Sequence, residues 1–127
     1  MDYVALVVVL ALLEYFFFVA MVGKARGTYS ISAPAITGDE NFERVFRVQQ
    51  NTLEQLVIFI PAIYLFGLYI HALAAAVMGI FFLVGRAIYY KSYITDPSTR
   101  TVGMVLGVFS YAVLTLGALI GIVIQLI

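Results

Sequence analysis

The chain has 127 residues, of which 64% are hydrophobic and 11% charged, and its formal net charge is zero. Soluble domains are only about 45–50% apolar, so the composition excludes an ordinary soluble domain, and the balanced charge excludes a general attraction for nucleic acid. No cysteine is present, which excludes disulfides, thiolate metal ligands and a protein-borne sulfur nucleophile. The single histidine cannot form a metal site alone, so we expect no metal.

The first apolar segment runs from Tyr3 to Val22 and is interrupted only by Glu14. A membrane-spanning helix needs roughly 20 apolar residues, so we expect a helix over 3–25. The segment lacks the basic start and the small-residue cleavage site of a signal peptide, which argues against that alternative. A carboxylate at this depth is a candidate functional group. The interpretation that we favour is a neutral or hydrogen-bonded Glu14 at a subunit contact.

The middle of the chain contains no charged residue over 56–84. Together with the amphipathic stretch before it and the residues up to 93, this run is long enough for two membrane spans. It therefore predicts helices over 41–70 and 73–93, and the turn between them is the weakest boundary.

The last uncharged run, 102–127, follows the pair Asp96-Pro97. An aspartate followed by a proline is typical of the N-cap and first residue of a helix, so we expect a helix over 97–126. With the three helices before it, this helix predicts an all-α fold, an integral membrane four-helix bundle that forms a single domain over 1–127.

Basic side chains cluster around the loops that follow the first and third predicted helices. They are Lys24, Arg26, Arg44, Arg47, Arg86, Lys91 and Arg100. Because successive helices alternate in direction, both loops lie on one side of the membrane. The excess of lysine and arginine predicts that this side is cytoplasmic, and we expect a bacterial inner-membrane protein. For Arg44 and Lys91 we favour the alternative that they only reach lipid headgroups.

Arg47, Asn51 and Glu54 follow one another at i, i+4 and i+7, so they share one helix face. Charged and amide groups at the entrance to hydrocarbon are costly and rarely accidental. Arginine binds carboxylates with a two-pronged donor fork, so a small zwitterionic or anionic ligand with several carboxylates suits this face. A structural network, in which these residues pair with one another or with a neighbouring helix, fits the spacing equally well.

Four segments carry these residues: VGKAR at 22–26, FERVFRVQQNTLE at 42–54, VGRAIYYKSY at 84–93 and DPSTR at 96–100. In this order and spacing they resemble the MAPEG superfamily, the membrane-associated proteins in eicosanoid and glutathione metabolism. The chain is most similar to the smaller microsomal glutathione S-transferases and their bacterial relatives. The resemblance implies a homotrimer that binds glutathione between adjacent subunits, within the cytoplasmic leaflet.

The resemblance also implies roles for individual residues. Glu54 is implied to accept the γ-glutamyl amino group, Arg47 to pair with a glutathione carboxylate, and Arg100 to lie beside the sulfur. The other implied glutathione contacts are Arg26, Gln49, Asn51, Arg86, Tyr89 and Tyr93. This chain departs from some family members at two positions. Gly27 replaces a second arginine, so we do not expect leukotriene-type epoxide conjugation. Gln55 replaces an aromatic residue.

These residue types fit thiol chemistry. A thiol is nucleophilic as the thiolate, and a cation beside the sulfur in a dry site lowers the thiol pKa. We therefore expect a glutathione transferase in which Arg100 stabilises the thiolate for attack on a lipophilic electrophile, with peroxidase activity towards lipid hydroperoxides as a second reaction. One alternative is a non-catalytic lipid-binding scaffold of the same superfamily. Another is a small proton-coupled multidrug exporter that uses Glu14, against which the long polar loop and the arginine-rich helix ends argue.

Overall fold

The computed structural model describes residues 1–127, which form helices and no strand. In chain order the helices are α1 (Asp2–Tyr29), α2 (Glu40–Phe66), η1 (Gly67–His71), α3 (Ala72–Thr95), η2 (Pro97–Thr99) and α4 (Thr101–Leu126). Three segments are long and apolar enough to cross a membrane: Asp2–Tyr29, Glu40–Thr95 and Thr101–Leu126. The predicted all-α class is therefore confirmed.

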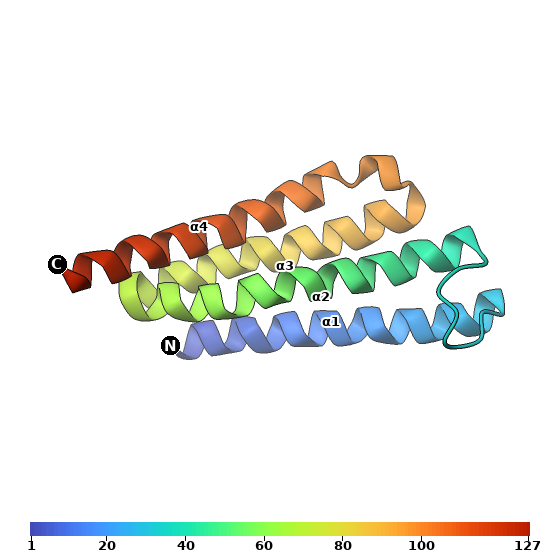
Figure 1. Ribbon diagram of the computed structural model, residues 1–127, viewed down its shortest axis with the longest axis horizontal. Helices are drawn as coiled ribbons and strands as arrows, with labels where there is room; N and C mark the ends of the chain where they lie inside the picture. The colour runs from blue at the N-terminus through green and yellow to red at the C-terminus, as the bar shows by residue number, and fades with distance from the viewer.

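The second of these segments reverses direction at η1, a short π-helical turn, so that α2 and α3 lie antiparallel (Figure 1). His71 ends the turn with an extended backbone, and its Nδ1 accepts a hydrogen bond from the Ala74 N–H at 3.3 Å. The first N–H groups of a helix have no hydrogen-bond partner within it, and the His71 side chain provides one for the start of α3. α2 ends at Phe66, before the predicted end at 70, because the backbone continues from there as the π-helical turn of η1 up to His71.

Two other boundaries differ from the predicted ranges. α1 continues past 25 to Tyr29, because an interior glycine weakens a helix by only about 1 kcal/mol and does not end it. The helix stops where Ser30 adopts the left-handed conformation, with a φ of 57°. Asp96 caps the single 3₁₀ turn of η2, so the α-helix that follows begins at Thr101 rather than at 97.

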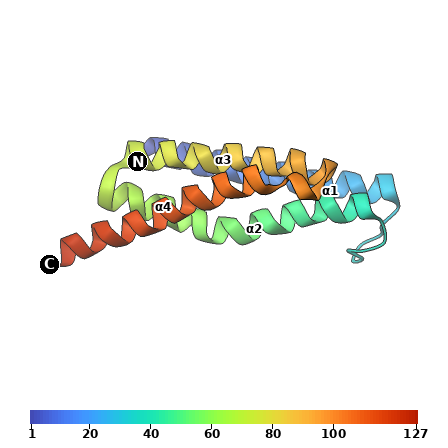
Figure 2. The same cartoon turned by 90° about the horizontal axis from the view of Figure 1, so that it is seen from above.

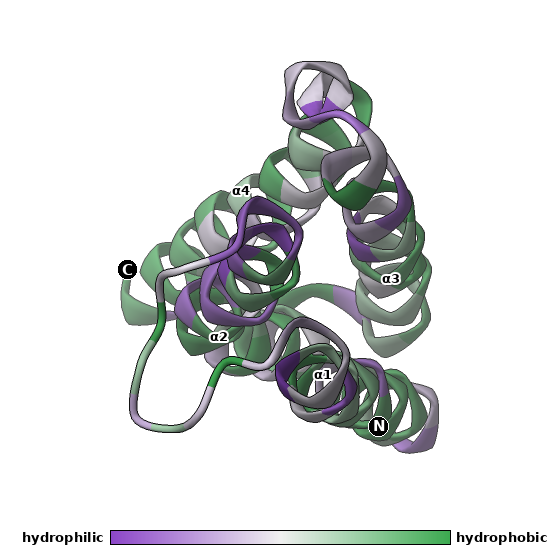
Figure 3. Ribbon diagram, turned by 90° about the vertical axis from the view of Figure 1, so that its right-hand side faces the viewer, coloured by the Kyte–Doolittle hydropathy of each residue, from purple (hydrophilic) through white to green (hydrophobic).

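The two loops that carry the basic residues lie at the same end of the bundle. The 30–39 loop and the α3–α4 connection are both at this end, which we call the loop end, while η1 and both termini are at the other (Figures 1 and 2). Viewed from the loop end, hydrophilic ribbon segments gather on the near turns of α2 and α1, and the helices behind them are hydrophobic (Figure 3). The expected grouping of polar residues at one end is therefore present.

The core lies where α1 to α4 meet. Phe59 of α2 stacks on Phe82 of α3 with ring centroids 4.0 Å apart, and Val4 and Leu114 pack into the same cluster from α1 and α4. Large apolar side chains also cover the outside of the bundle, including Phe16, which is 71% exposed. Because a soluble protein rarely exposes so continuous an apolar surface, this outer face suits contact with lipid.

The α3 and α4 backbones approach each other closely at glycines. A Cβ atom on Gly103 would lie 2.7 Å from the Gly85 carbonyl oxygen and 2.7 Å from the Tyr89 Cα. Since these neighbours are backbone atoms, only a residue without a side chain fits there. This contact fixes the position of the α3 turn that carries Arg86 and Tyr89.

Candidate functional site

A cavity of about 410 Å³ opens at the loop end, between the first turns of α2 and the last turns of α3. Its lining consists of Ile36, Glu40, Glu43, Arg44, Phe46, Arg47, Tyr93 and Pro97. Two of the predicted ligand contacts, Arg47 and Tyr93, therefore face one cavity, and the other predicted contacts lie outside its wall. The lining contains both carboxylates and guanidinium groups, which suits a ligand that carries charges of both signs.

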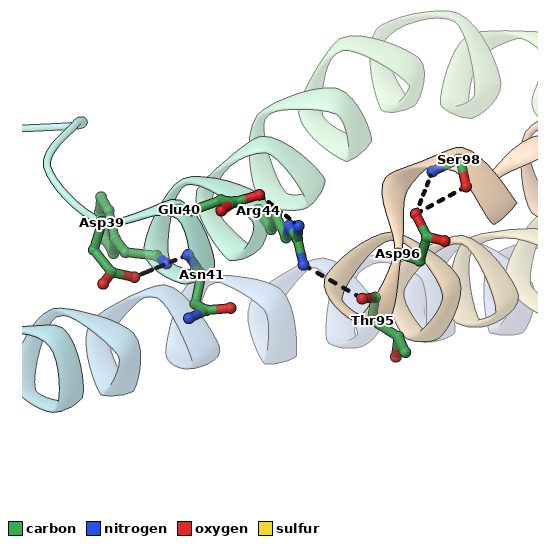
Figure 4. A network of polar contacts seen from close by, with 8 residues as sticks. Asp39, Glu40, Asn41, Arg44, Thr95, Asp96 and Ser98 are labelled. Carbon is green, nitrogen blue, oxygen red and sulfur yellow. Dashed lines mark hydrogen bonds and ion pairs between the residues drawn. The ribbon is translucent and has the colours of Figure 1, made fainter.

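Polar contacts hold the start of α2 to the end of α3 (Figure 4). Asp39 caps α2, because its Oδ1 accepts hydrogen bonds from two backbone N–H groups of the first turn at 2.8 and 3.0 Å. Arg44 donates to the Glu40 carboxylate at 2.6 Å and to the Thr95 carbonyl at 3.3 Å. Arg44 therefore contacts the protein itself, which differs from the headgroup contact that we favoured, and it fixes one wall of the cavity.

The turn into α4 places Pro97 in the cavity wall. Within this turn the Asp96 carboxylate accepts hydrogen bonds from the Ser98 hydroxyl at 2.8 Å and from the Ser98 N–H at 3.0 Å. These bonds stabilise the charged form and hold the pKa of Asp96 below its ordinary value of 3.8. Arg100, which follows the turn, is exposed and donates to the Pro97 carbonyl at 2.9 Å.

The outer face of α2, which consists of Arg47, Asn51 and Glu54, carries a weak ion pair. The Arg47 Nη1 and the Glu54 Oε1 are 3.5 Å apart, and the two side chains are 52% and 57% exposed. Such an exposed pair contributes only about 0–1 kcal/mol to stability. The pairing that the structural-network alternative expects is therefore present, but both charged groups can turn to a ligand at little cost.

Two predicted contacts are used within the chain. Arg26 donates to the Ala35 carbonyl at 2.7 Å and lies 5.0 Å from the centroid of the Phe42 ring, so it holds the 30–39 loop against α2. Gln49 donates to the Tyr15 hydroxyl at 2.7 Å and so points towards α1. In this chain both residues support the surroundings of the cavity rather than line it.

Arg86 of α3 packs against α2 and has no exposed surface. Its Nη2 donates to the Thr52 hydroxyl at 2.8 Å and its Nη1 to the Gln55 Oε1 at 3.1 Å. We call Thr52 and Gln55 the inner face of α2. Its contribution was not predicted from the sequence, although the i, i+3 spacing of Thr52 and Gln55 places both on one side of the helix and was a usable signal.

Two polar atoms near this network have no hydrogen-bond partner in the chain. They are the Glu14 Oε1 on α1 and the Arg86 Nε on α3, both buried. No salt bridge joins the two side chains. Within one chain this Glu14 oxygen therefore has no partner, and the neutral or hydrogen-bonded Glu14 that we expected at a subunit contact stays a prediction.

An aromatic pair connects the buried arginine to the loop end. Tyr89 stacks on Tyr93 with ring centroids 5.3 Å apart, and the Arg86 guanidinium lies 4.3 Å from the centroid of the Tyr89 ring. The three predicted residues of α3, Arg86, Tyr89 and Tyr93, are thus in contact through Tyr89, and Tyr93 lines the cavity.

Several known proteins are similar to this chain. The model of the MAPEG family matches residues 4–120. An uncharacterized protein of Synechocystis sp. is 45% identical over 96% of this chain and 89% of its own length. Human microsomal glutathione S-transferase 2 is 37% identical over 93% of this chain and 80% of its own. Rat leukotriene C4 synthase is 35% identical over 76% of this chain and 64% of its own.

Proposed function

Because the chain belongs to the MAPEG family, we propose that it is a membrane-bound glutathione transferase that stabilises the glutathione thiolate for attack on lipophilic electrophiles. The similarity to a microsomal glutathione S-transferase over 93% of the chain supports the activity. The observation that carries the proposal is the exposed Arg47–Glu54 pair, which offers a cation and an anion on one face beside a cavity. The γ-glutamyl end of glutathione carries the complementary carboxylate and ammonium groups.

We propose that the protein is a homotrimer in which each subunit crosses the membrane four times. The reversal at η1 supports the four crossings, since it divides Glu40–Thr95 into two helices that can each span the bilayer. Glutathione lies between adjacent subunits at the loop end, on the cytoplasmic side of a bacterial inner membrane. Arg47, Asn51, Glu54 and Tyr93 of one subunit then bind it together with Arg26 and Gln49 of the next.

Arg100 is the proposed catalytic residue. Its guanidinium is exposed at the start of α4 and has only one hydrogen bond, to a backbone carbonyl, so it can turn to the glutathione sulfur. A cation there lowers the thiol pKa from about 8.5. The thiolate then forms a bond to the electrophilic carbon while the leaving group departs. Arg86 and Tyr89 complete the proposed site from α3.

A peroxidase reaction uses the same thiolate. The sulfur attacks one oxygen of a lipid hydroperoxide, the O–O bond breaks, and the lipid alcohol leaves after protonation. The glutathione sulfenic acid that remains reacts with a second glutathione to give the disulfide and water. This reaction needs no group beyond those that bind glutathione.

The test measures thiolate formation and turnover separately. The purified protein in detergent is mixed with glutathione and the ultraviolet absorbance of the thiolate is followed, after which chlorodinitrobenzene is added. We expect Arg100→Ala to lose about tenfold or more of the thiolate signal at neutral pH, because the thiol pKa rises by about one unit or more. We expect Glu54→Ala chiefly to weaken glutathione binding.

The matched control is Lys91→Ala, which removes an exposed cation at the same end of α3 and should change neither quantity. Binding of glutathione without a thiolate signal would indicate the scaffold function instead. The assignment of Arg100 fails if Arg100→Ala forms thiolate as the unchanged protein does.

A further inference from the structure

Gln55 belongs to the inner face of α2 and connects it to the outer face through hydrogen bonds. Its Oε1 accepts from the Arg86 Nη1 at 3.1 Å, and its Nε2 donates to the Asn51 Oδ1 at 3.3 Å. Gln55 is only 9% exposed, whereas Asn51 is part of the outer face and is half-buried. One amide therefore joins a fully buried guanidinium to a residue that faces the proposed ligand.

The direction of these hydrogen bonds is fixed by chemistry. A guanidinium carries donors and no acceptor, so Gln55 must turn its oxygen towards Arg86. The nitrogen of the same amide then points to Asn51 and can only donate, so Asn51 must turn its own oxygen inwards. The Asn51 Nδ2, with its two N–H groups, is left for the outer face.

The surroundings prevent the amide from turning over. Arg86 is itself held by the Thr52 hydroxyl at 2.8 Å and by the ring of Tyr89. On the α4 side, the Gln55 Oε1 would lie 3.3 Å from a Cβ atom on Gly107, so that helix packs directly against it. Reversing the amide would place its N–H₂ group against the donors of Arg86, which is costly in a buried site.

We propose that Gln55 is a positioning residue that transmits the donor polarity of the buried Arg86 to Asn51, so that Asn51 presents its Nδ2–H groups to a carbonyl or carboxylate oxygen of the bound ligand. The inference rests on the proposed function for the identity of that ligand, glutathione. It gives the outer face a fixed pattern, with donors at Arg47 and Asn51 and an acceptor at Glu54. It also gives Arg86 a role in binding that requires no direct contact with the ligand.

The variant that tests this is Gln55→Glu. The new carboxylate has nearly the same shape and accepts hydrogen bonds from Arg86, so the inner network is kept. It cannot donate, however, so Asn51 must turn its Nδ2 inwards and present its oxygen to the ligand. We expect the glutathione KM to rise about tenfold, as for one lost hydrogen bond to a charged group, and kcat at saturating glutathione to stay within about twofold.

The matched control is Gln55→Glu in the Asn51→Ala variant. This variant lacks the Asn51 amide but keeps any long-range effect of the negative charge that Gln55→Glu adds. If Gln55 acts through Asn51, Gln55→Glu has no further effect on KM there, and the two substitutions are strongly non-additive. Additive effects would overturn the inference, because they would show that the carboxylate acts by its charge alone. An unchanged KM for Gln55→Glu in the otherwise unchanged protein would overturn it as well.

A second measurement needs no glutathione. In ¹⁵N-labelled protein, the side-chain amide signals of Asn51 are assigned by their loss in Asn51→Ala. Gln55→Glu should shift them downfield and slow their hydrogen exchange, since the Nδ2–H groups become bonded to a buried carboxylate. Unchanged signals would overturn the inference, whereas failure of the protein to bind glutathione would reject only the proposed function.

Discussion

The two faces of α2 carry polar residues of similar type and differ in what those residues do. On the outer face, Arg47 and Glu54 are more than half exposed and 3.5 Å apart. On the inner face, Thr52 and Gln55 bind an arginine that has no exposed surface, at 2.8 and 3.1 Å. The outer pair is loose enough to exchange its partner for a ligand, while the inner contacts are short and buried. One helix therefore holds the proposed binding surface and the network that we propose orients it.

The comparison predicts that changes to the inner side reduce stability and that changes to the outer side reduce ligand binding. The largest effect is expected where α3, which carries Arg86, meets α4. Gly103→Ala places a Cβ atom 2.7 Å from the Tyr89 Cα, so the two helices must separate. We expect a loss of about 3 kcal/mol in the free energy of unfolding, measured by thermal and denaturant unfolding in detergent.

The control for this variant is Gly23→Ala. Gly23 is also inside a long helix, but an added Cβ atom there would meet nothing within 4 Å. It should therefore raise stability by about 1 kcal/mol through helix propensity alone. A similar loss in both variants would show that the α3–α4 contact is not the cause.

The inner face is broken by Thr52→Val, which keeps the shape of the side chain and removes the acceptor for the Arg86 Nη2. An unsatisfied buried donor costs about 1–3 kcal/mol, and we expect a loss of stability in that range. Thr115→Val is the control, because the Thr115 hydroxyl is exposed and bonds only to the Tyr111 carbonyl of its own helix. Equal stabilities of the two variants would mean that the Arg86 network contributes nothing to the fold.

The outer face is broken by Glu54→Gln, which removes the charge with little change in shape. Because the ion pair is half exposed, we expect unfolding to change by less than about 0.5 kcal/mol. Glutathione affinity should fall about tenfold or more, since the ammonium group loses its charged partner. Calorimetric titration measures the affinity, and a stability loss equal to that of Thr52→Val would remove the distinction between the two faces.

The smallest expected effect is on the pH dependence of stability, and it comes from Asp96, which lies outside both faces of α2. The pKa of Asp96 is lower in the folded chain than its ordinary value, so Asp96 adds stability above that value and loses this contribution as the pH falls through the folded pKa. Asp96→Asn keeps a good helix-capping residue and should slightly flatten the acid side of a melting temperature–pH curve. An unchanged curve would show that the Ser98 hydrogen bonds add nothing.

The sequence predicted the outer face and not the inner one for a physical reason. The spacing of Arg47, Asn51 and Glu54 defines a helix face without reference to any other helix. The partners of Arg86 depend on how α3 is rotated about its axis relative to α2, and that rotation is set by packing, including the glycine contact with α4. Apolar runs do not report it, so Thr52 remained unnoticed and Gln55 was noted only as a departure.

Family membership and the all-helical class were predicted correctly from apolar runs and from short segments in their order. Boundaries were predicted less well, because Asp96-Pro97 signals the start of any helical turn and here starts a 3₁₀ turn. The roles of Arg26 and Gln49 within one chain also required the structure. Both side chains find partners in neighbouring elements, the 30–39 loop and Tyr15, that no spacing along the chain relates to them.

The gathering of every lysine and arginine towards the loop end has a consequence for how the protein is inserted. Turning the molecule over would drag these cations through hydrocarbon, at a cost of about 2.5–3.5 kcal/mol for each one at the bilayer centre. Flip-flop is therefore negligible once the chain has been inserted, and each copy keeps the orientation in which it was inserted. The proposed reaction at the loop end would then be vectorial, since glutathione would be drawn from the compartment that this end faces and the charged conjugate released there, whatever route the lipophilic electrophile takes through the bilayer.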